Sequence, residues 1–321
     1  MKENREILRL VEICRLYYEK ELTQAQIAKK LNISRPAVSK LLAEARKRGI
    51  VKIEIRSPLD SDEDLLDKLA RLFGLKGGLI IPSGAKDEQL ISRLLISQAV
   101  VYVEKFLPTI KRIGIGWGST LGNLIDEFKP QTVKQAKGGI VCPIIGNAPN
   151  AIQWLQTNEL ARIFAQKTGF TPYYLHAPAF PGSESNKQHF TNTLEYQKIL
   201  EIWESLDAVL VGVGTYPSVP DQATAVRFGR LLKVKHAAGD IATYYFDQDG
   251  HFIETPEDIV IRIPLEHFKH AKKVIAICGG MQKLTAIRGA LLTGLITHLI
   301  TDEITARELI KLHFKPILEE L

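Results

Sequence analysis

Apolar side chains near the N-terminus recur at mostly helical intervals and predict a short first helix. These apolar positions are Ile7, Leu8, Val11, Cys14, Leu16 and Tyr18. The pattern stops before Leu22, where Thr23 can cap a second helix and Gln26, three positions later, can bond back to the cap backbone. This capping-box spacing predicts a second helix that ends near Leu31.

A tight turn and a third helix follow. Asn32 lies where a turn requires a positive φ, which Asn tolerates better than most residues. Ser34 can cap the third helix, Pro36 falls in its first turn, and Gly49 marks its end. Ala28 is small where the second and third helices would cross, and the expected shared core is Ile27, Leu31, Ile33, Val38, Leu41 and Leu42. This arrangement predicts a helix-turn-helix.

The third helix has an apolar face and an exposed face. We expect the inward face to hold Ala37, Val38, Leu41, Leu42 and Ala45. The opposite face, which a helix-turn-helix places against base edges, holds Arg35, Pro36, Ser39, Lys40 and Ala43. Arg35 suits a bidentate contact with guanine, and Ser39 suits a base or a phosphate. Phosphate contacts are expected from Lys40, Arg46, Lys47 and Arg48.

A helix-turn-helix with localised positive charge predicts DNA binding. Residues 1–56 hold 14 basic and 7 acidic side chains, a net charge of +7, whereas the rest holds 28 and 29, a net charge of −1. Residues 51–55 alternate as a short strand or wing. The predicted DNA-binding residues are Thr23, Ser34, Arg35, Pro36, Ser39, Lys40, Arg46 and Lys47. The alternative is a helical hairpin that contacts another protein; the partner we expect is double-stranded operator DNA.

The remainder of the chain alternates short apolar runs with helical segments. The runs cover residues 79–81, 112–115, 140–145, 208–212, 273–277 and 299–301. This alternation predicts an α/β fold with a mostly parallel, doubly wound, Rossmann-like sheet. We expect three parts: a winged helix-turn-helix domain over residues 1–57, an amphipathic linker helix within residues 58–75, and an effector-binding and oligomerisation domain over residues 76–321.

Three loops of this domain carry suitable ligand chemistry. Residues 116–120 follow a predicted strand and open a helix, so Gly118, Ser119 and Thr120 offer backbone N–H groups and hydroxyls to a phosphate, although an ordinary tight turn has the same pattern. Residues 279–283 repeat this arrangement and add the ammonium group of Lys283. Asp240 is expected after a third loop, where it could accept hydrogen bonds from sugar hydroxyls or serve as a cap.

Other classes of protein are not favoured. No apolar stretch approaches the ~18 residues of a membrane span, so we expect a cytoplasmic protein without membrane contact. Cys14, Cys142 and Cys278 are widely separated and indicate small buried residues rather than a disulfide framework or a metal site. Residues 116–120 are not a Walker loop, because Gly-Lys followed by Ser or Thr is absent, and we expect no cofactor.

Several segments together resemble the SorC/DeoR family of sugar-responsive bacterial transcription regulators. The likeness runs through residues 22–42, GlyIleGlyTrpGlySerThrLeu at 114–121, LeuValGlyValGly at 210–214, AlaGlyAspIle at 238–241, TyrPheAspGlnAspGly at 245–250 and LeuIleThrAspGluIleThrAla at 299–306. The resemblance implies that Gly118, Ser119, Thr120 and Lys283 hold a phosphate, that Gln156 and Asp240 contact a sugar, and that Arg227 lies near a further anion-binding position.

The resemblance also implies an effector class and an oligomeric state, and at one position this chain differs from some family members. Residues 141–147, 189–190 and 203–207 are similar to the sorbose-regulator branch, which implies a ketose or ketose phosphate as the effector, and a homo-oligomer, dimer or tetramer. Members that trap an aldehyde as a Schiff base carry Lys where this chain has Ile145, which argues against covalent capture.

Two alternatives to a regulator remain. The family's large domain is similar in fold to sugar-phosphate isomerases and glucosamine-phosphate deaminases, which need a base beside the sugar carbon. Asp240, Asp302, Glu303 and His176 are candidates for that base, but no spacing singles out a pair, so we do not expect an enzyme. The other alternative is a large domain that serves only for oligomerisation.

Overall fold

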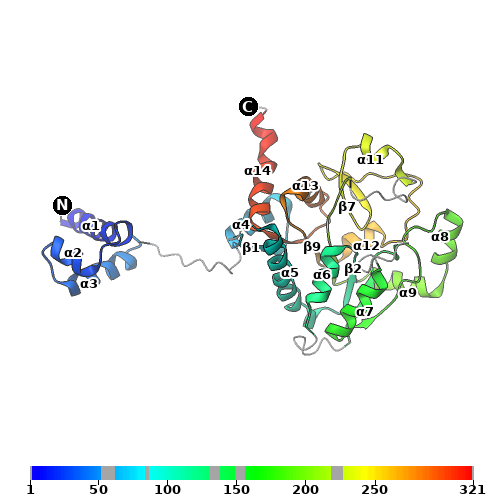
Figure 1. Cartoon of the computed structure of the whole chain (residues 1–321), viewed down its shortest axis with the longest axis horizontal. Coiled ribbons are helices and arrows are strands. Elements are labelled where there is room, and N and C mark those ends of the chain that lie inside the picture. The colour runs from blue at the N-terminus through cyan, green and yellow to red at the C-terminus, as the bar shows by residue number, and fades with distance from the viewer. Residues whose placement is uncertain are drawn as a thin grey trace. The chain divides into compact units, whose positions relative to one another are not determined.

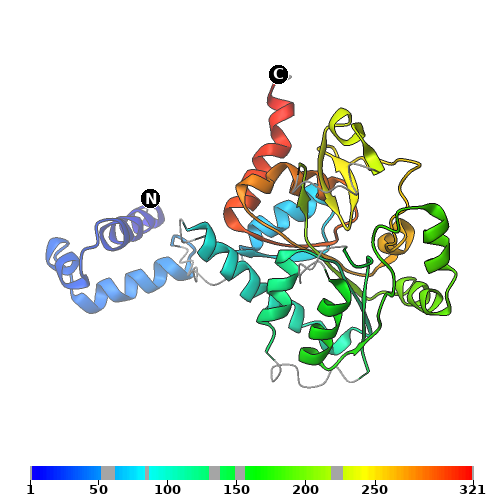
Figure 2. The same cartoon turned by 45° about the vertical axis from the view of Figure 1, so that its right-hand side comes forward.

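A computed structural model describes residues 2–51, 62–83, 87–129, 138–148, 156–217 and 227–319. The chain divides into two compact units, Met1–Ser57 and Pro58–Leu321 (Figures 1 and 2). The predicted wing at residues 51–55 falls almost wholly outside the described residues.

The first unit is helical and begins as its capping residues predict. Its elements are α1 (Lys2–Cys14), a π-helical turn (Arg15–Glu19), α2 (Gln24–Lys30) and α3 (Arg35–Lys47). Thr23 and Gln26 form the predicted capping box, and the Ser34 side chain accepts a hydrogen bond from the backbone of Ala37. Asn32 has a φ of 51°, which confirms the predicted turn.

The core of the first unit confirms the second and third helices and revises the first. Its buried side chains are Leu10, Ile13, Cys14, Ile27, Ala28, Val38, Leu42 and Ala45. In α1, however, Ile7 and Leu8 are 40% and 67% exposed. Periodicity alone did not show which apolar stripe of α1 would face α3, because that helix has apolar residues on two sides.

The second unit is built on a sheet of seven strands in the order β1-β10-β9-β5-β2-β3-β4, and every pairing in it is parallel. Its strands are β1 (Gly77–Ile81), β2 (Arg112–Ile115), β3 (Ile140–Pro143), β4 (Thr171–Pro172), β5 (Ala208–Val211), β9 (Val274–Ile277) and β10 (His298–Asp302). The prediction of a doubly wound α/β sheet is confirmed.

Helices cover both faces of this sheet (Figures 1 and 2). In β9, Val274 and Ala276 pack into one core while Ile275 and Ile277 pack into the other, which explains why the strands read as continuous apolar runs. The helices are α4 (Glu63–Phe73), α5 (Glu88–Glu104), α6 (Ser119–Glu127), α7 (Thr157–Thr168), α8 (Glu184–Thr191), α9 (Leu194–Trp203), α11 (Leu231–Val234), α12 (Leu265–His270), α13 (Leu284–Leu292) and α14 (Glu303–Glu319), with short 3₁₀ turns η2 (Leu107–Thr109) and η4 (Met281–Lys283).

The predicted linker helix is part of the second unit. Leu65, Leu69 and Phe73 on α4 are buried in the same core as the sheet, and Asp62 caps the helix at Leu65. Its apolar face is therefore covered within the second unit.

A second, antiparallel sheet was not predicted. It consists of β6 (Gly214–Thr215), β7 (Ala237–Ile241) and β8 (Tyr244–Asp247). Asp240 was expected after a loop but lies within β7, where it pairs with Gly214 of β6. The expectation was wrong because residues 237–247 form a tight hairpin whose Ala242 and Thr243 both have positive φ.

Candidate functional site

The exposed face of α3 carries the predicted base-reading residues. Arg35, Pro36, Ser39 and Lys40 are all exposed at its N-terminal half, and Arg46 and Lys47 are exposed in its last turn. Val38 and Leu42 anchor the opposite face in the core. The helix can thus enter a groove with its N-terminal residues foremost while its backbone stays fixed on α1 and α2.

The two capping hydroxyls are engaged in the fold. Thr23 Oγ1 accepts from the Gln26 backbone at 3.3 Å and contacts Gln26 Oε1 at 2.9 Å. Ser34 Oγ accepts from the Ala37 backbone at 3.3 Å. Both lie at exposed helix starts, so their predicted DNA contacts are compatible with their capping roles.

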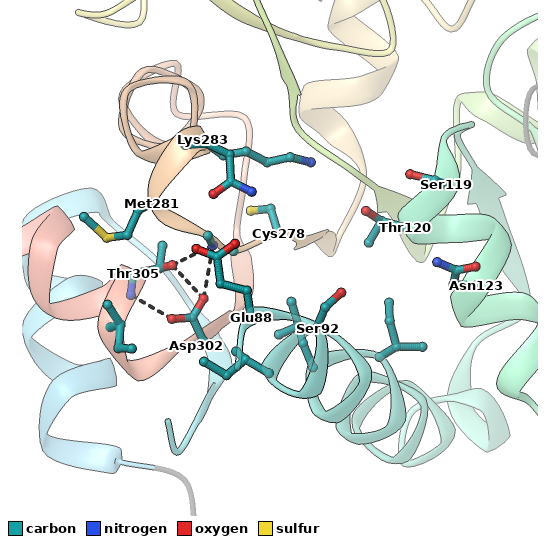
Figure 3. A pocket seen from close by; sticks show the side chains of 17 residues that line it. Glu88, Ser92, Ser119, Thr120, Asn123, Cys278, Met281, Lys283, Asp302 and Thr305 are labelled. Atoms are coloured by element: carbon teal, nitrogen blue, oxygen red, sulfur yellow. Dashed lines mark hydrogen bonds between the residues drawn. The ribbon is translucent and has the colours of Figure 1, made fainter. Parts of the chain in front are cut away.

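A cavity of about 260 Å³ opens at the carboxyl ends of the parallel strands (Figure 3). Its walls are helix α5, the start of α6, the segment after β9 and the start of α14. The strand order reverses at β5: β2 is followed by β3 toward one edge of the sheet, and β9 is followed by β10 toward the other edge. Ligands of open α/β sheets bind outside such a reversal of strand order.

Ser119, Thr120 and Lys283 line this one cavity, although Lys283 lies 163 positions after Thr120 in the chain. Gly118 precedes α6 with a φ of 117°, a backbone conformation that favours glycine, and a Cβ built there would have no neighbour within 4 Å. In Figure 3 the Lys283 side chain extends toward the side of the cavity that holds Ser119 and Thr120. Its Nζ lies 3.5 Å from the carbonyl oxygen of Val213.

The glycine loop that carries Lys283 is held by α14. Asp302 accepts from the Thr305 backbone at 2.8 Å and from the Thr305 hydroxyl at 2.6 Å, and Gly280 N donates to both side chains, at 3.2 and 2.8 Å (Figure 3). A Cβ at Gly279 would lie 2.4 Å from Asp302 Oδ2, so only glycine permits this approach. Asp302 therefore positions the loop, and both its oxygens have donors.

Four predicted effector residues lie outside the lining of the cavity: Gly118, which directly precedes the lining residue Ser119, and Gln156, Arg227 and Asp240. Gln156 precedes α7, and its Nε2 donates to Ala148 O at 3.1 Å. Asp240 accepts from the Thr243 backbone at 2.9 Å and packs against Gly214, which follows Val213. Residues 149–155 and 218–226, which precede Gln156 and Arg227, are outside the described part of the chain.

Arg227 lies in a buried ionic cluster. Its Nη2 donates to Asp258 at 2.8 Å, and Asp258 also accepts from Arg262 at 2.6 Å. The Arg227 guanidinium lies 5.3 Å from the ring centre of Phe180 and 4.8 Å from that of Phe228. Burial lowers the pKa of Arg227, and its Nε and Nη1 have no partner among the described residues. An anion-binding role for these two donors stays a prediction.

Polar lining residues that the sequence did not reveal include Glu88, Ser92, Asn123 and Thr305. Asn123 follows Thr120 by one helical turn, a spacing that could have indicated it. Glu88 and Ser92 share a face of α5 for the same reason, but the sequence does not tell which strand ends that face would cover.

The cysteines are confirmed as buried and unpaired. Cys278 lines the cavity, where burial raises the pKa of its thiol to about 12, with Asp302 adding to the rise and Lys283 opposing it. The thiol is therefore neutral and acts as a small apolar wall. Ile145 is fully buried, and no described group of three or more His, Cys, Asp or Glu could hold a metal ion.

Comparisons with known proteins agree with both units. The sequence model described as "Putative sugar-binding domain" matches residues 57–311, and a MarR-family model matches residues 15–61. The sorbitol operon regulator of Klebsiella pneumoniae is 30% identical over 97% of this chain and 100% of its own length. The chain belongs to the SorC/DeoR family of sugar-responsive transcriptional regulators.

Further relatives span the whole regulator. The deoxyribonucleoside regulator of Bacillus subtilis is 29% identical over 94% of this chain and 96% of its own length. The crystal structure of the full-length sorbitol regulator of K. pneumoniae aligns with a TM-score of 0.70 and 28% identity over 95% of this chain and 99% of that one. This regulator thus joins a DNA-binding helix-turn-helix to a sugar-binding domain, and none of its described helices has the length and apolarity needed to cross a membrane.

Proposed function

We propose that this regulator controls a carbohydrate-utilisation operon in the cytoplasm and that its effector is a phosphorylated sugar. The observation that carries the proposal is that one cavity is lined by Ser119 and Thr120, at the start of α6, and by Lys283. Two hydroxyls and an ammonium group therefore face the same space. A helix N-terminus beside an ammonium group and two hydroxyls is suited to a dianionic phosphate. The resemblance of residues 141–147, 189–190 and 203–207 to the sorbose-regulator branch supports a ketose skeleton.

The proposal includes binding of operator DNA by at least two copies of α3, in a dimer or tetramer. A repeated operator requires paired recognition helices. Effector binding alters DNA binding only if the sugar prefers one quaternary state, because equal affinity for both states would shift nothing. No catalytic step is part of the proposal, since Asp302, the acidic candidate closest to the glycine loop, has a positioning role.

Replacing Lys283 by Met tests the phosphate site. We expect the variant to lose most of the thermal stabilisation that a sugar phosphate gives the full chain, and to keep any stabilisation by the unphosphorylated sugar, because only the phosphate requires the ammonium charge. The measurement is the unfolding temperature across a panel of sugars and their phosphates. Lys198→Met, an exposed charge change on α9, is the control. Equal losses for phosphorylated and free sugars would contradict the assignment.

A further inference from the structure

The cavity has charges of both signs, and their positions limit the ligands it can accept. Among the described lining residues, the charged side chains are Lys283, Glu88 and Asp302. The carboxylate of Asp302 is 3% exposed and turned to Thr305 and Gly280. Glu88 is different: it is exposed, lies in the first turn of α5, and faces the cavity.

Glu88 and Lys283 come from different walls. Lys283 stands on the loop after β9 and extends toward α6, whereas Glu88 stands on α5, with Ser92 one turn farther along (Figure 3). A phosphate seated between Lys283, Ser119 and Thr120 has its charge compensated there. The rest of the ligand then meets a carboxylate and a hydroxyl, which accept and donate hydrogen bonds as sugar hydroxyls require.

We infer that Glu88 is a specificity-determining residue that admits sugar monophosphates and rejects bisphosphates. The inference rests on the proposed phosphate site at Lys283. A second phosphate on the same small ligand would bring another double negative charge toward the Glu88 carboxylate inside a cavity of about 260 Å³. The repulsion between the second phosphate and the Glu88 carboxylate within one cavity should lower the affinity for the bisphosphate by roughly tenfold or more.

A purely structural role for Glu88 makes a different prediction. An acidic residue in the first turn of a helix stabilises that helix through its dipole, and Asp87 already caps α5 by accepting from the Gln89 and Leu90 backbone. Loss of such a role would lower the unfolding temperature of the free protein. It would not change the ratio of affinities for monophosphates and bisphosphates, so this ratio is the decisive readout.

The test compares matched ligand pairs by calorimetric titration of the full chain. The pairs are fructose 6-phosphate with fructose 1,6-bisphosphate, and ribulose 5-phosphate with ribulose 1,5-bisphosphate, and inorganic phosphate serves as a minimal probe. We expect wild type to favour the monophosphate of a pair that binds, and Glu88→Gln to reduce this preference by about tenfold. Glu201→Gln, an exposed charge change on α9, is the control and should leave the preference unchanged.

The outcomes separate the two proposals. The proposed role of Glu88 is wrong if bisphosphates bind as tightly as monophosphates, or if Glu88→Gln leaves the preference for monophosphates unchanged. In either case the phosphate site stands, provided that monophosphate binding depends on Lys283. If neither the monophosphates nor inorganic phosphate bind, the phosphate site is wrong and the inference falls with it.

Discussion

Arg35 combines an exposed side chain with a backbone that is fixed on both sides. Ser34, directly before it, caps α3 through Ala37, and Val38, one turn later, is buried in the core. The guanidinium therefore starts from a rigid Cα, as base reading requires, and the fork of donors matches guanine. Arg46 is equally exposed but lies in the last turn of α3, where a cation is better placed for phosphate oxygens.

This difference predicts different losses for the two arginines. Arg35→Ala should weaken binding to a specific operator by about 1–3 kcal/mol and binding to random DNA much less. Arg46→Ala should weaken both to a similar degree. The measurement is fluorescence anisotropy at fixed salt with a duplex that the protein itself has selected from a random pool. A uniform loss in Arg35→Ala would reassign that residue to the phosphate backbone.

At the scale of elements, the sequence predicted the helices and strands whose formation depends on a local pattern of residues. The helix-turn-helix followed from caps at Thr23 and Ser34, and the parallel sheet from strands that are apolar on both faces. The position of Asp240 and the packing of α4 could not be predicted, because each depends on which distant segment covers an element. The same holds for Glu88, which reaches the cavity only because α5 packs against β1, β9 and β10.

The glycine loop after β9 shows how one element positions another. The position of this loop depends on Gly280 N, which donates to Asp302 at the end of β10 and to Thr305 in the first turn of α14. Thr305 is fully buried, and its hydroxyl accepts from Gly280 while it donates to Asp302. Removal of this hydroxyl leaves the loop with fewer acceptors and a buried carboxylate with fewer donors.

Thr305→Val should therefore lower the free energy of unfolding by about 1–3 kcal/mol, because a buried polar network loses its central member. Sugar phosphate affinity should fall in parallel, because the loop carries Lys283. Urea unfolding can be followed by tryptophan fluorescence, since all three tryptophans lie in the second unit. Thr305→Ser keeps the hydroxyl and should retain most of both properties; a variant that binds normally would show that the loop does not need this anchor.

For the whole molecule, charge is divided between the two units. The first carries the excess of positive charge that attracts a phosphate backbone, while the second is nearly neutral. A neutral effector domain can approach DNA without adding unspecific attraction or strong repulsion. Salt should therefore act mainly on the helix-turn-helix, whereas a histidine buried in the second unit contributes to the pH dependence of stability.

His298 is the described histidine with the clearest effect on that pH dependence. It is 4% exposed on β10, and burial, followed by the charges of Lys273 and Lys76, lowers its pKa to about 4. Its Nε2 lies 3.5 Å from Lys273 Nζ, and its Nδ1 lies 2.8 Å from Thr297 Oγ1. Lys273 can donate only to an unprotonated nitrogen, so the neutral ring suits both contacts.

The consequence for stability has a definite sign. The unfolded chain protonates His298 near its ordinary pKa of 6.5, so between pH 6.5 and 4 the unfolded state binds more protons than the native state. The neutral His298 ring contributes up to about 3 kcal/mol to the free energy of unfolding. This contribution is complete above pH 6.5 and is lost as the pH falls toward 4. Urea unfolding of His298→Gln by tryptophan fluorescence should show a shallower loss over this window, while the control His270→Gln, at an exposed position, should follow wild type. Identical pH profiles for wild type and His298→Gln would mean that the native state protonates this ring as readily as the unfolded chain does.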